Sequence, residues 1–184
     1  MYSILIIGLD NAGKTTLLEK IKQQYLNQIP LPPEKIAPTV GLNMAKIQYE
    51  KNSIINFWDL GGQSDLQNIW KNYYSECHGI CFVIDATDKE RLEQCKLVFE
   101  KLVLDDRIQG VPIVMLANKQ DITGKSLSVE SIKEIFNKIA IKLEASDSKV
   151  LPISALTGLG VGDAIDWLCS RMILNKLERP PVLK

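Results

Sequence analysis

The feature that most constrains the fold is a continuous apolar run near the start of the chain that stops abruptly at a glycine. Residues 3–8 read SILIIG, followed by LDNAG and then by KTTLLEKIKQQYL. A run without alternating polar residues is typical of a strand buried on both faces of a parallel sheet. In the next segment Leu17, Leu18 and Ile21 recur with helical spacing. The start of the chain therefore predicts a strand, a tight turn and a helix.

The same alternation continues along the chain. GICFVID (79–85) and VPIVMLAN (111–118) are predicted to be two more buried strands, and KVLPISA (149–155) a weaker last one. Helical periodicity is expected over about residues 89–104, 129–141 and 162–174. MAKIQYE and SIINFWD flank Lys51-Asn52 and are predicted to form one antiparallel pair. The pattern indicates an α/β fold, a single domain over residues 1–184, with about six mostly parallel strands and helices on both faces.

Composition excludes several classes of protein. The chain has 184 residues, and its 22 Lys+Arg balance 22 Asp+Glu, so no basic footprint for nucleic acid exists. No apolar run reaches the roughly 18 residues of a transmembrane helix, and neither Tyr2 nor the tail PPVLK fits a lipidation motif. Without a CxxC pair or a secretory signal, the four cysteines are interpreted as reduced packing residues of a cytoplasmic protein. They are Cys77, Cys81, Cys95 and Cys169.

The glycine-rich stretch GLDNAGKT fits G-x-x-x-x-G-K-[ST] between a predicted strand and a predicted helix. Its backbone N–H groups are expected to point at phosphates, Lys14 to reach the β- and γ-phosphates, and the Thr15 hydroxyl to bind Mg²⁺. A chance glycine turn is the alternative. The predicted phosphate-binding residues of this loop are Gly8, Leu9, Asp10, Asn11, Ala12, Gly13, Lys14, Thr15 and Thr16.

A second motif, WDLGGQ, follows a predicted strand. Asp59 is expected to face the metal through water, the Gly62 N–H to approach the γ-phosphate, and Gln63 to orient the attacking water. With Lys14, Gln63 is the predicted catalytic residue. The alternative is an ordinary strand-to-helix turn with the aspartate as its cap.

The third and fourth motifs concern the base. NKQD comprises Asn118, Lys119 and Asp121 around a glutamine, directly after a strand. A carboxylate at Asp121 can accept hydrogen bonds from N1–H and the 2-amino group of guanine, whereas adenine offers neither donor. Lys119 is expected to lay its stem along the ring. In the SAL segment (Ser154, Ala155, Leu156) the Ala155 N–H is expected to reach guanine O6, with a capping loop as the alternative.

The proline-rich segment 27–43, NQIPLPPEKIAPTVGLN, is predicted to be a functional loop. The Thr39 hydroxyl can reach Mg²⁺ only if this loop closes over the γ-phosphate. Loss of that phosphate would release this loop and the one after Asp59, which makes an order–disorder switch.

The order and details of these motifs resemble the ADP-ribosylation factor (Arf) family of small GTPases. GLDNAGKTT, PTVGLN, WDLGGQ and NKQD carry the resemblance, which covers almost the whole chain. YYSECHGICFVIDATDKERL and ERPP look most like its Arf-related, trans-Golgi branch. The resemblance implies a P-loop small-GTPase fold, GTP or GDP as bound nucleotide with Mg²⁺, and a strand pair over about residues 44–59 that slides in register between states. It also implies an effector patch at Leu42, Trp58 and Tyr73, where Leu42 replaces the usual Phe.

Partners and location follow from the same resemblance. It implies a guanine nucleotide exchange factor, a GTPase-activating protein, and Golgi effectors recruited in the GTP state, acting on a monomer in the cytoplasm and reversibly on Golgi or trans-Golgi membranes. The family's N-terminal amphipathic helix is not visible in this sequence. It is therefore expected to be truncated, and membrane association to depend on that missing segment.

Catalysis is expected to be slow without a partner. The four arginines are Arg91, Arg107, Arg171 and Arg179, and none lies in the switch segments between residues 36 and 70. An activating protein would therefore supply an arginine in trans. A carboxylate at Asp10 does not favour hydrolysis either. Three alternatives are a P-loop ATPase or kinase, which NKQD opposes, a binding module that holds GTP permanently, and a structural domain with decayed motifs.

Overall fold

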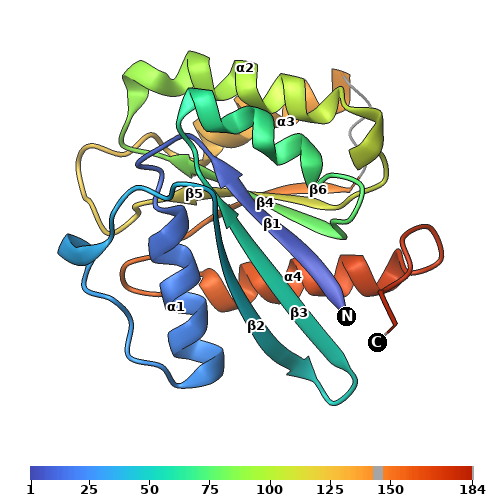
Figure 1. Cartoon of the computed structure of the whole chain (residues 1–184). Coiled ribbons are helices and arrows are strands. Elements are labelled where there is room, and N and C mark those ends of the chain that lie inside the picture. Colours follow the sequence, from blue (N-terminus) through green and yellow to red (C-terminus); the bar gives the residue numbers. More distant parts are fainter. Residues whose placement is uncertain (143–146, 184) are drawn as a thin grey trace.

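The centre of the molecule is a six-stranded sheet with the order β2-β3-β1-β4-β5-β6 (Figure 1). The computed structural model describes residues 1–142 and 147–183. The strands are β1 (Tyr2–Gly8), β2 (Leu42–Glu50), β3 (Ser53–Leu60), β4 (Gly79–Asp85), β5 (Ile113–Asn118) and β6 (Ser148–Pro152). All neighbours pair in parallel except β2 and β3. The predicted sheet, with one antiparallel pair, is confirmed.

Helices cover both faces of this sheet (Figure 1). They are α1 (Lys14–Leu26), α2 (Leu92–Val103), α3 (Val129–Lys142) and α4 (Val161–Leu174). On one face α1 and α4 bury aliphatic side chains such as Leu17 and Leu168 against the sheet. On the other face Phe99 of α2 and Phe136 of α3 pack against Phe82 of β4, with ring centroids 5.2 and 6.3 Å from it. Two apolar cores therefore hold the sheet rigidly between them.

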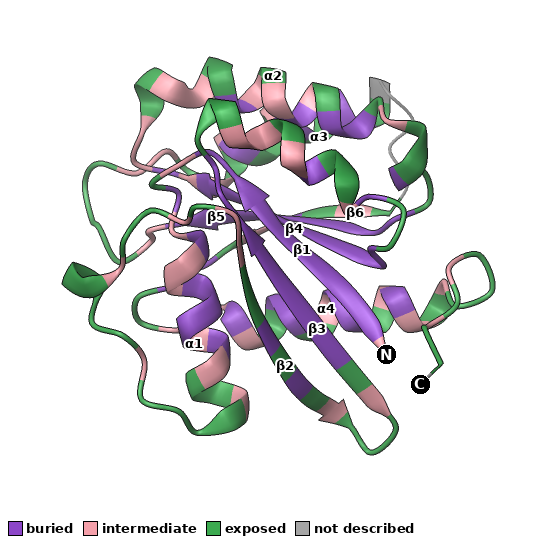
Figure 2. Ribbon diagram, viewed as in Figure 1, coloured by how far each residue is buried: buried purple, intermediate pink, exposed green. Residues whose placement is uncertain are grey.

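Burial explains why the central strands read as continuous apolar runs. Every residue of β1 and β5 is buried, whereas most residues of the edge strand β2 are exposed or half-buried (Figure 2). The four cysteines are buried free thiols. Their predicted role as packing residues is confirmed.

Element boundaries differ from the sequence pattern in four places. Strand β5 begins at Ile113, two residues later than expected. Strand β2 begins two residues earlier than expected because Leu42 pairs with Leu60. The last strand ends at Pro152, since the Ser154 N–H turns to the Leu159 carbonyl at 2.9 Å. The helix expected from residue 89 begins as a short 3-10 turn, η3 (Lys89–Arg91), before α2. Three other 3-10 segments, which no periodicity indicated, are η1 (Pro33–Lys35), η2 (Ser64–Asn72) and η4 (Asp106–Ile108).

The two ends of the chain lie side by side, at the edge of the sheet opposite the carboxyl ends of the parallel strands (Figure 1). The Met1 nitrogen donates to the Val182 carbonyl at 2.8 Å. His78 links the same two segments: its Nδ1 accepts from the Ser3 N–H at 3.0 Å, and its Nε2 lies 3.0 Å from the Pro180 carbonyl. None of the helices within the described ranges has the length and apolarity that crossing a membrane requires.

Candidate functional site

A cavity of about 350 Å³ lies beyond the carboxyl ends of the parallel strands, where loops from several predicted motifs meet. Ligands in open α/β sheets bind at this edge because the loops that follow the strands converge there. The lining comes from the glycine-rich loop, the proline-rich segment, the loop after Asp59 and Lys119. The lining residues are Asp10, Asn11, Gly13, Lys14, Thr15, Thr16, Pro33, Ile36, Ala37, Pro38, Thr39, Gly62, Gln63 and Lys119.

The glycine-rich loop has a backbone path that only glycine accommodates at two positions. Gly8 has φ +148°, and a Cβ there would lie 2.3 Å from the Val83 carbonyl oxygen. Gly13 has φ +98°, and a Cβ there would lie 2.3 Å from the Asn118 Nδ2. That amide in turn donates to the Ala12 carbonyl at 2.8 Å. The loop therefore packs closely against β4 and β5, in a backbone conformation that depends on these two glycines.

Lys14 sits at the floor of the cavity. Its ammonium donates to the Leu9 carbonyl at 2.7 Å, and the side chain is buried. Burial lowers the pKa of Lys14 to about 8, although the nearby Asp59 and Asp10 carboxylates oppose that shift. An anion in the cavity would add a further charged partner to this buried ammonium and favour its charged form.

Three oxygen-bearing side chains from separate elements converge beside Lys14. The Thr15 hydroxyl lies 2.7 Å from Asp59 Oδ2 and 2.9 Å from the Thr39 hydroxyl. Asn43 of β2 donates to both Thr39 and Asp59 at 3.2 Å. Burial raises the pKa of Asp59, and hydrogen bonds from Thr15 and Asn43 counteract it.

This cluster passes a test for a hard cation. The Asp59 Oδ1 atom is buried and has no hydrogen-bond partner among the residues that the structure describes. An orphaned carboxylate oxygen beside two hydroxyls is the donor chemistry of Mg²⁺, which takes few protein ligands and keeps several waters. Residues 1–142 and 147–183 contain no group of three His, Cys, Asp or Glu that could hold a metal ion.

The loop after Asp59 is closed onto the glycine-rich loop. A Cβ on Gly62 would lie 2.3 Å from Lys14 Nζ and 2.5 Å from the Asp10 nitrogen, so only glycine fits. Gln63 follows, exposed at the start of η2, with its side chain on the lining of the cavity. Thr39 and Gly62 thus both lie at the end of the cavity where the sequence predicts a γ-phosphate.

The loops expected to hold the base form a hydrogen-bonded network. The Ser154 hydroxyl donates to Asp121 Oδ1 at 2.6 Å, which orients that carboxylate. The Ala155 N–H, predicted to reach guanine O6, donates here to Asn118 Oδ1 at 2.9 Å. Lys119 has a positive φ of 71° and donates to the Asn11 carbonyl at 2.8 Å. Leu156 is 49% exposed. Of the predicted guanine-binding residues, Lys119 lines the cavity and the others do not.

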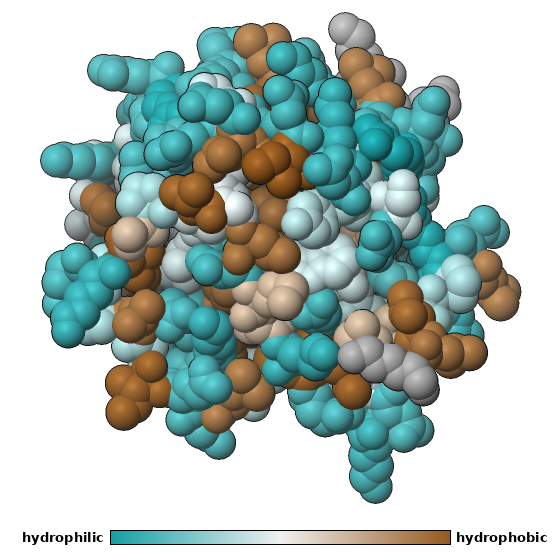
Figure 3. Space-filling view, viewed as in Figure 1, coloured by the Kyte–Doolittle hydropathy of each residue, from teal (hydrophilic) through white to brown (hydrophobic). Residues whose placement is uncertain are grey.

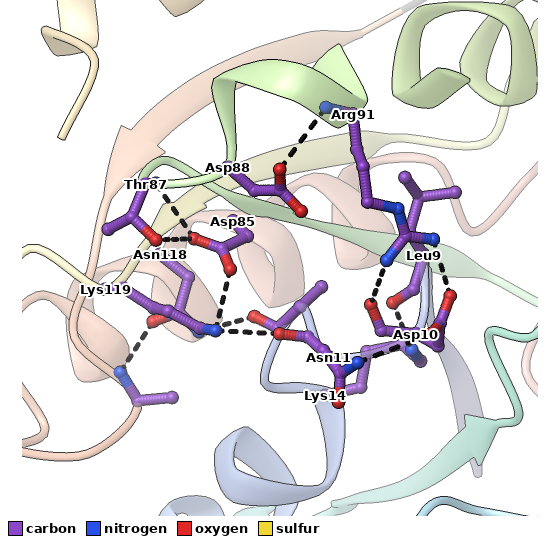
Figure 4. Close-up of polar contacts among 12 residues, drawn as sticks. Leu9, Asp10, Asn11, Lys14, Asp85, Thr87, Asp88, Arg91, Asn118 and Lys119 are labelled. Carbon is purple, nitrogen blue, oxygen red and sulfur yellow. Dashed lines mark hydrogen bonds and ion pairs between the residues drawn. The ribbon is translucent and has the colours of Figure 1, made fainter. Parts of the chain in front are cut away.

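Sequence reasoning missed four residues that support the site. Asp85 accepts from Lys119 at 2.7 Å and from the Thr87 hydroxyl at 2.6 Å (Figure 4). Burial alone would raise the pKa of Asp85, but the bonds from Lys119 and Thr87 hold it below its usual range. Asn43 joins the cation cluster, and Arg91 reaches Asp10. Of the four, only Asp85 could have been predicted from the sequence, because an acidic residue at the carboxyl end of a buried strand is placed at the ligand-binding edge of the sheet.

The predicted effector residues come together on the β2–β3 side of the molecule. Trp58 and Tyr73 have ring centroids 5.3 Å apart, and Leu42 packs against the same core cluster. Trp58 is only 9% exposed, whereas nearby Val40 and Met44 are 84% and 57% exposed. In the space-filling view, hydrophobic side chains lie in separate groups among hydrophilic ones (Figure 3).

Comparison with known proteins decides the family. A model of the ADP-ribosylation factor family matches residues 1–172. The chain belongs to the ADP-ribosylation factor family. It is therefore a small GTPase, a GTP-binding switch that hydrolyses GTP. The resemblance predicted from the motifs is confirmed, and a family of GTP hydrolases gives no support to the alternative of a permanently GTP-bound module.

Relatives within the family agree with the predicted Arf-related branch. ADP-ribosylation factor-like protein 3 of Saccharomyces cerevisiae is 54% identical over 183 residues, covering 100% of this chain and 91% of the relative. ADP-ribosylation factor-related protein 1 of Homo sapiens is 46% identical over 181 residues, covering 98% of this chain and 89% of the relative.

The fold has a close counterpart among solved structures. The Arl6 BBS3 small GTPase from Trypanosoma brucei with bound GppNp superposes with a TM-score of 0.79, over 94% of this chain and 98% of that one, at 24% identity.

Proposed function

We propose that this GTPase acts as a switch in Golgi and trans-Golgi membrane traffic, with the cavity as its nucleotide site. The observation that carries the site assignment is the simultaneous approach of Thr39 and Gly62 to the phosphate-binding loop. The Thr39 hydroxyl is 2.9 Å from that of Thr15, and Gly62 leaves no room for a Cβ above Lys14. Two loops that meet at the γ-phosphate position are what a GTP-sensing switch requires.

The residues of the site divide the chemistry among them. Thr15, Thr39 and, through water, Asp59 would hold Mg²⁺, which when bound supplies charge stabilisation to the phosphates. Lys14 and the loop amides stabilise charge on the β- and γ-phosphates, while Gln63 positions the attacking water. Asp121 reads the two guanine donors, with Ser154 holding its orientation. Lys119 covers the base, anchored by Asp85.

Catalysis by these residues is incomplete. None of the described residues that line the cavity is an arginine. A cationic finger is worth on the order of 10³ to 10⁵ in rate for such enzymes. We therefore propose that a GTPase-activating protein inserts an arginine next to Gln63, which is exposed and accessible to it.

The switch would work through partners at the membrane. An exchange factor loads GTP, and Golgi effectors then bind the surface around Leu42, Trp58 and Tyr73. Similarity to the Arf-related relatives supports the Golgi assignment. The mixed character of this surface, with Met44 57% exposed beside aromatic rings, suits a transient protein contact.

Single-turnover hydrolysis with the purified protein tests the catalytic part. We expect bound GTP to convert to GDP over many minutes, and to convert far faster when a cognate activating protein is added. A rate near one per second without a partner would contradict the need for an arginine in trans, on the scale of about 5–20 per second that activated enzymes reach. Golgi localisation is tested by imaging the full-length tagged protein together with a Gln63→Leu variant, and diffuse distribution of both would contradict the membrane role.

A further inference from the structure

Arg91 is joined to the phosphate-binding loop across 81 residues of sequence. Its Nη2 lies 2.6 Å from Asp10 Oδ1, and its Nη1 donates to the Asp10 carbonyl at 3.1 Å (Figure 4). The remaining Nε donates to Gln94 at 3.2 Å. All three nitrogens of the guanidinium are thus occupied, and Arg91 itself does not line the cavity. The arginine is not a finger, and it acts on Asp10.

The charges on the cavity lining show what this ion pair changes. Three charged residues line the cavity: Asp10, Lys14 and Lys119. Lys119 is already paired with Asp85 at 2.7 Å. The Asp59 carboxylate already acts on Lys14 from beside the cavity, and an unpaired Asp10 carboxylate would add a second negative charge. Pairing with Arg91 offsets that second charge.

Asp10 lies next to the position proposed for the γ-phosphate. Its backbone nitrogen is one of three atoms close to Gly62, at 2.5 Å from where a Gly62 Cβ would lie; the others are Lys14 Nζ and the Gly8 carbonyl oxygen. Its side chain and that of Arg91 are 33% and 30% exposed, so water screens the pair only in part. A phosphate beside Gly62 would therefore feel a free carboxylate on Asp10 as direct repulsion.

We propose that Arg91 is a positioning residue that holds and neutralises Asp10, and so makes the phosphate-binding loop favour GTP over GDP. The inference rests on the γ-phosphate lying beside Gly62, as proposed above. The pair also fixes the path of the loop, because Arg91 holds the Asp10 main-chain carbonyl as well as the carboxylate. Extra negative charge on the nucleotide raises the cost of an unpaired Asp10, so the triphosphate depends on Arg91 more than the diphosphate does.

Competition binding with GDP and with a non-hydrolysable GTP analogue tests this. In Arg91→Gln we expect affinity for the analogue to fall about three- to tenfold more than affinity for GDP, with the gap closing in high salt. Adding Asp10→Asn to Arg91→Gln removes both charges and is expected to restore the ratio of the two affinities. Arg91→Lys, which keeps the charge but loses the two-point grip, should lie between.

Arg171→Gln is the matched control, since Arg171 pairs with Asp147 at 3.4 Å on another part of the surface. Equal losses for GDP and the analogue in Arg91→Gln, or no loss, would overturn the proposal, because a merely structural arginine affects both nucleotides alike. A lowered ratio that persists in the double variant would also overturn it. If the unaltered protein retains neither nucleotide, the proposed site itself fails, which is a different result.

Discussion

The residues predicted to hold the base, here called the base side of the proposed site, and those predicted to meet the γ-phosphate, the γ-phosphate side, are held by different kinds of contact. On the base side Asn118 is buried and bonded to the Ala12 carbonyl at 2.8 Å and to the Ala155 N–H at 2.9 Å. The loop that carries Asn118 follows β5, whose residues are all buried, and the loop that carries Ala155 follows the partly exposed edge strand β6. On the γ-phosphate side Thr39 lies in a largely exposed segment, and its hydroxyl meets Thr15 and Asp59.

This difference in contacts suggests that the base side binds the nucleotide and that the γ-phosphate side changes conformation with the nucleotide state. We expect loops that already hold one another by hydrogen bonds to keep their arrangement before the nucleotide arrives, and so to bind guanine in GTP and GDP alike. A segment attached through a few polar contacts opens at little cost, and a phosphate with its cation can close it. We therefore expect changes on the base side to affect both nucleotides, and changes on the γ-phosphate side to affect GTP alone.

Asp121→Asn should have the largest effect and should strike both nucleotides equally. The amide loses the charged acceptor for the guanine donors, so affinity for GTP and GDP is expected to fall by about 10³-fold. Xanthine carries an oxygen where guanine carries the 2-amino group, so the Asn amide should favour xanthosine nucleotides. Competition between GTP and xanthosine triphosphate measures the switch in preference. Unchanged preference, with the exposed-helix variant Asp163→Asn as control, would show that Asp121 does not read the base.

Gln63→Leu should act on hydrolysis alone. Loss of the side chain that positions water is expected to slow single-turnover hydrolysis with an activating protein by about 100-fold or more. Binding of GTP and GDP should stay unchanged, since Gln63 is exposed and contributes no contact to the base side. Asn68→Leu, an equally exposed position in η2, provides the control. Normal turnover in Gln63→Leu would remove the glutamine from the mechanism.

Thr39→Ala and Asp85→Asn test the two sides against each other. Without its hydroxyl, Thr39 cannot serve the cation, so GTP-analogue dissociation is expected to quicken about tenfold while GDP dissociation changes little. Asp85→Asn loosens Lys119, and both nucleotides should dissociate faster by roughly the same few-fold factor. Stopped-flow dissociation of fluorescent nucleotides measures both rates. If both variants changed the dissociation rates of the two nucleotides by the same factors, the distinction between the base side and the γ-phosphate side would be wrong.

His78 gives the smallest effect, far from both sides. Burial lowers its pKa below the ordinary value of about 6.5. The unfolded chain then binds the proton more readily, so stability is expected to fall as the pH drops through about 6.5 and to level off below the folded-state pKa. The readout is a drop of a few degrees in Tm between pH 7 and pH 5. His78→Gln, in a chain with one histidine, should flatten that slope and leave the GTP-to-GDP affinity ratio unchanged; an identical slope would assign it to other groups.

Local pattern predicted most of the fold. Buried strands such as GICFVID and helices such as KTTLLEKIKQQYL appear within a residue or two of their expected bounds. Both patterns, a continuous apolar run and helical spacing, can be recognised from residues that are close in sequence. Segment η2 was missed, since nine residues of 3-10 helix leave no regular apolar repeat. The nucleotide-binding motifs could be recognised for the same reason, because each is a short stretch of consecutive residues at the end of a strand.

Sequence by itself identified the family, and it predicted a preference for guanine from Asp121 and the need for a partner's arginine from where the arginines lie. Tertiary structure alone decided which distant groups serve those motifs. Asp85 anchors Lys119 across 34 residues, and Arg91 holds Asp10 across 81. Such pairs are brought together by the crossover connections of a parallel sheet, which place chain-distant strand ends at one edge. No periodicity or short motif records a contact of that kind.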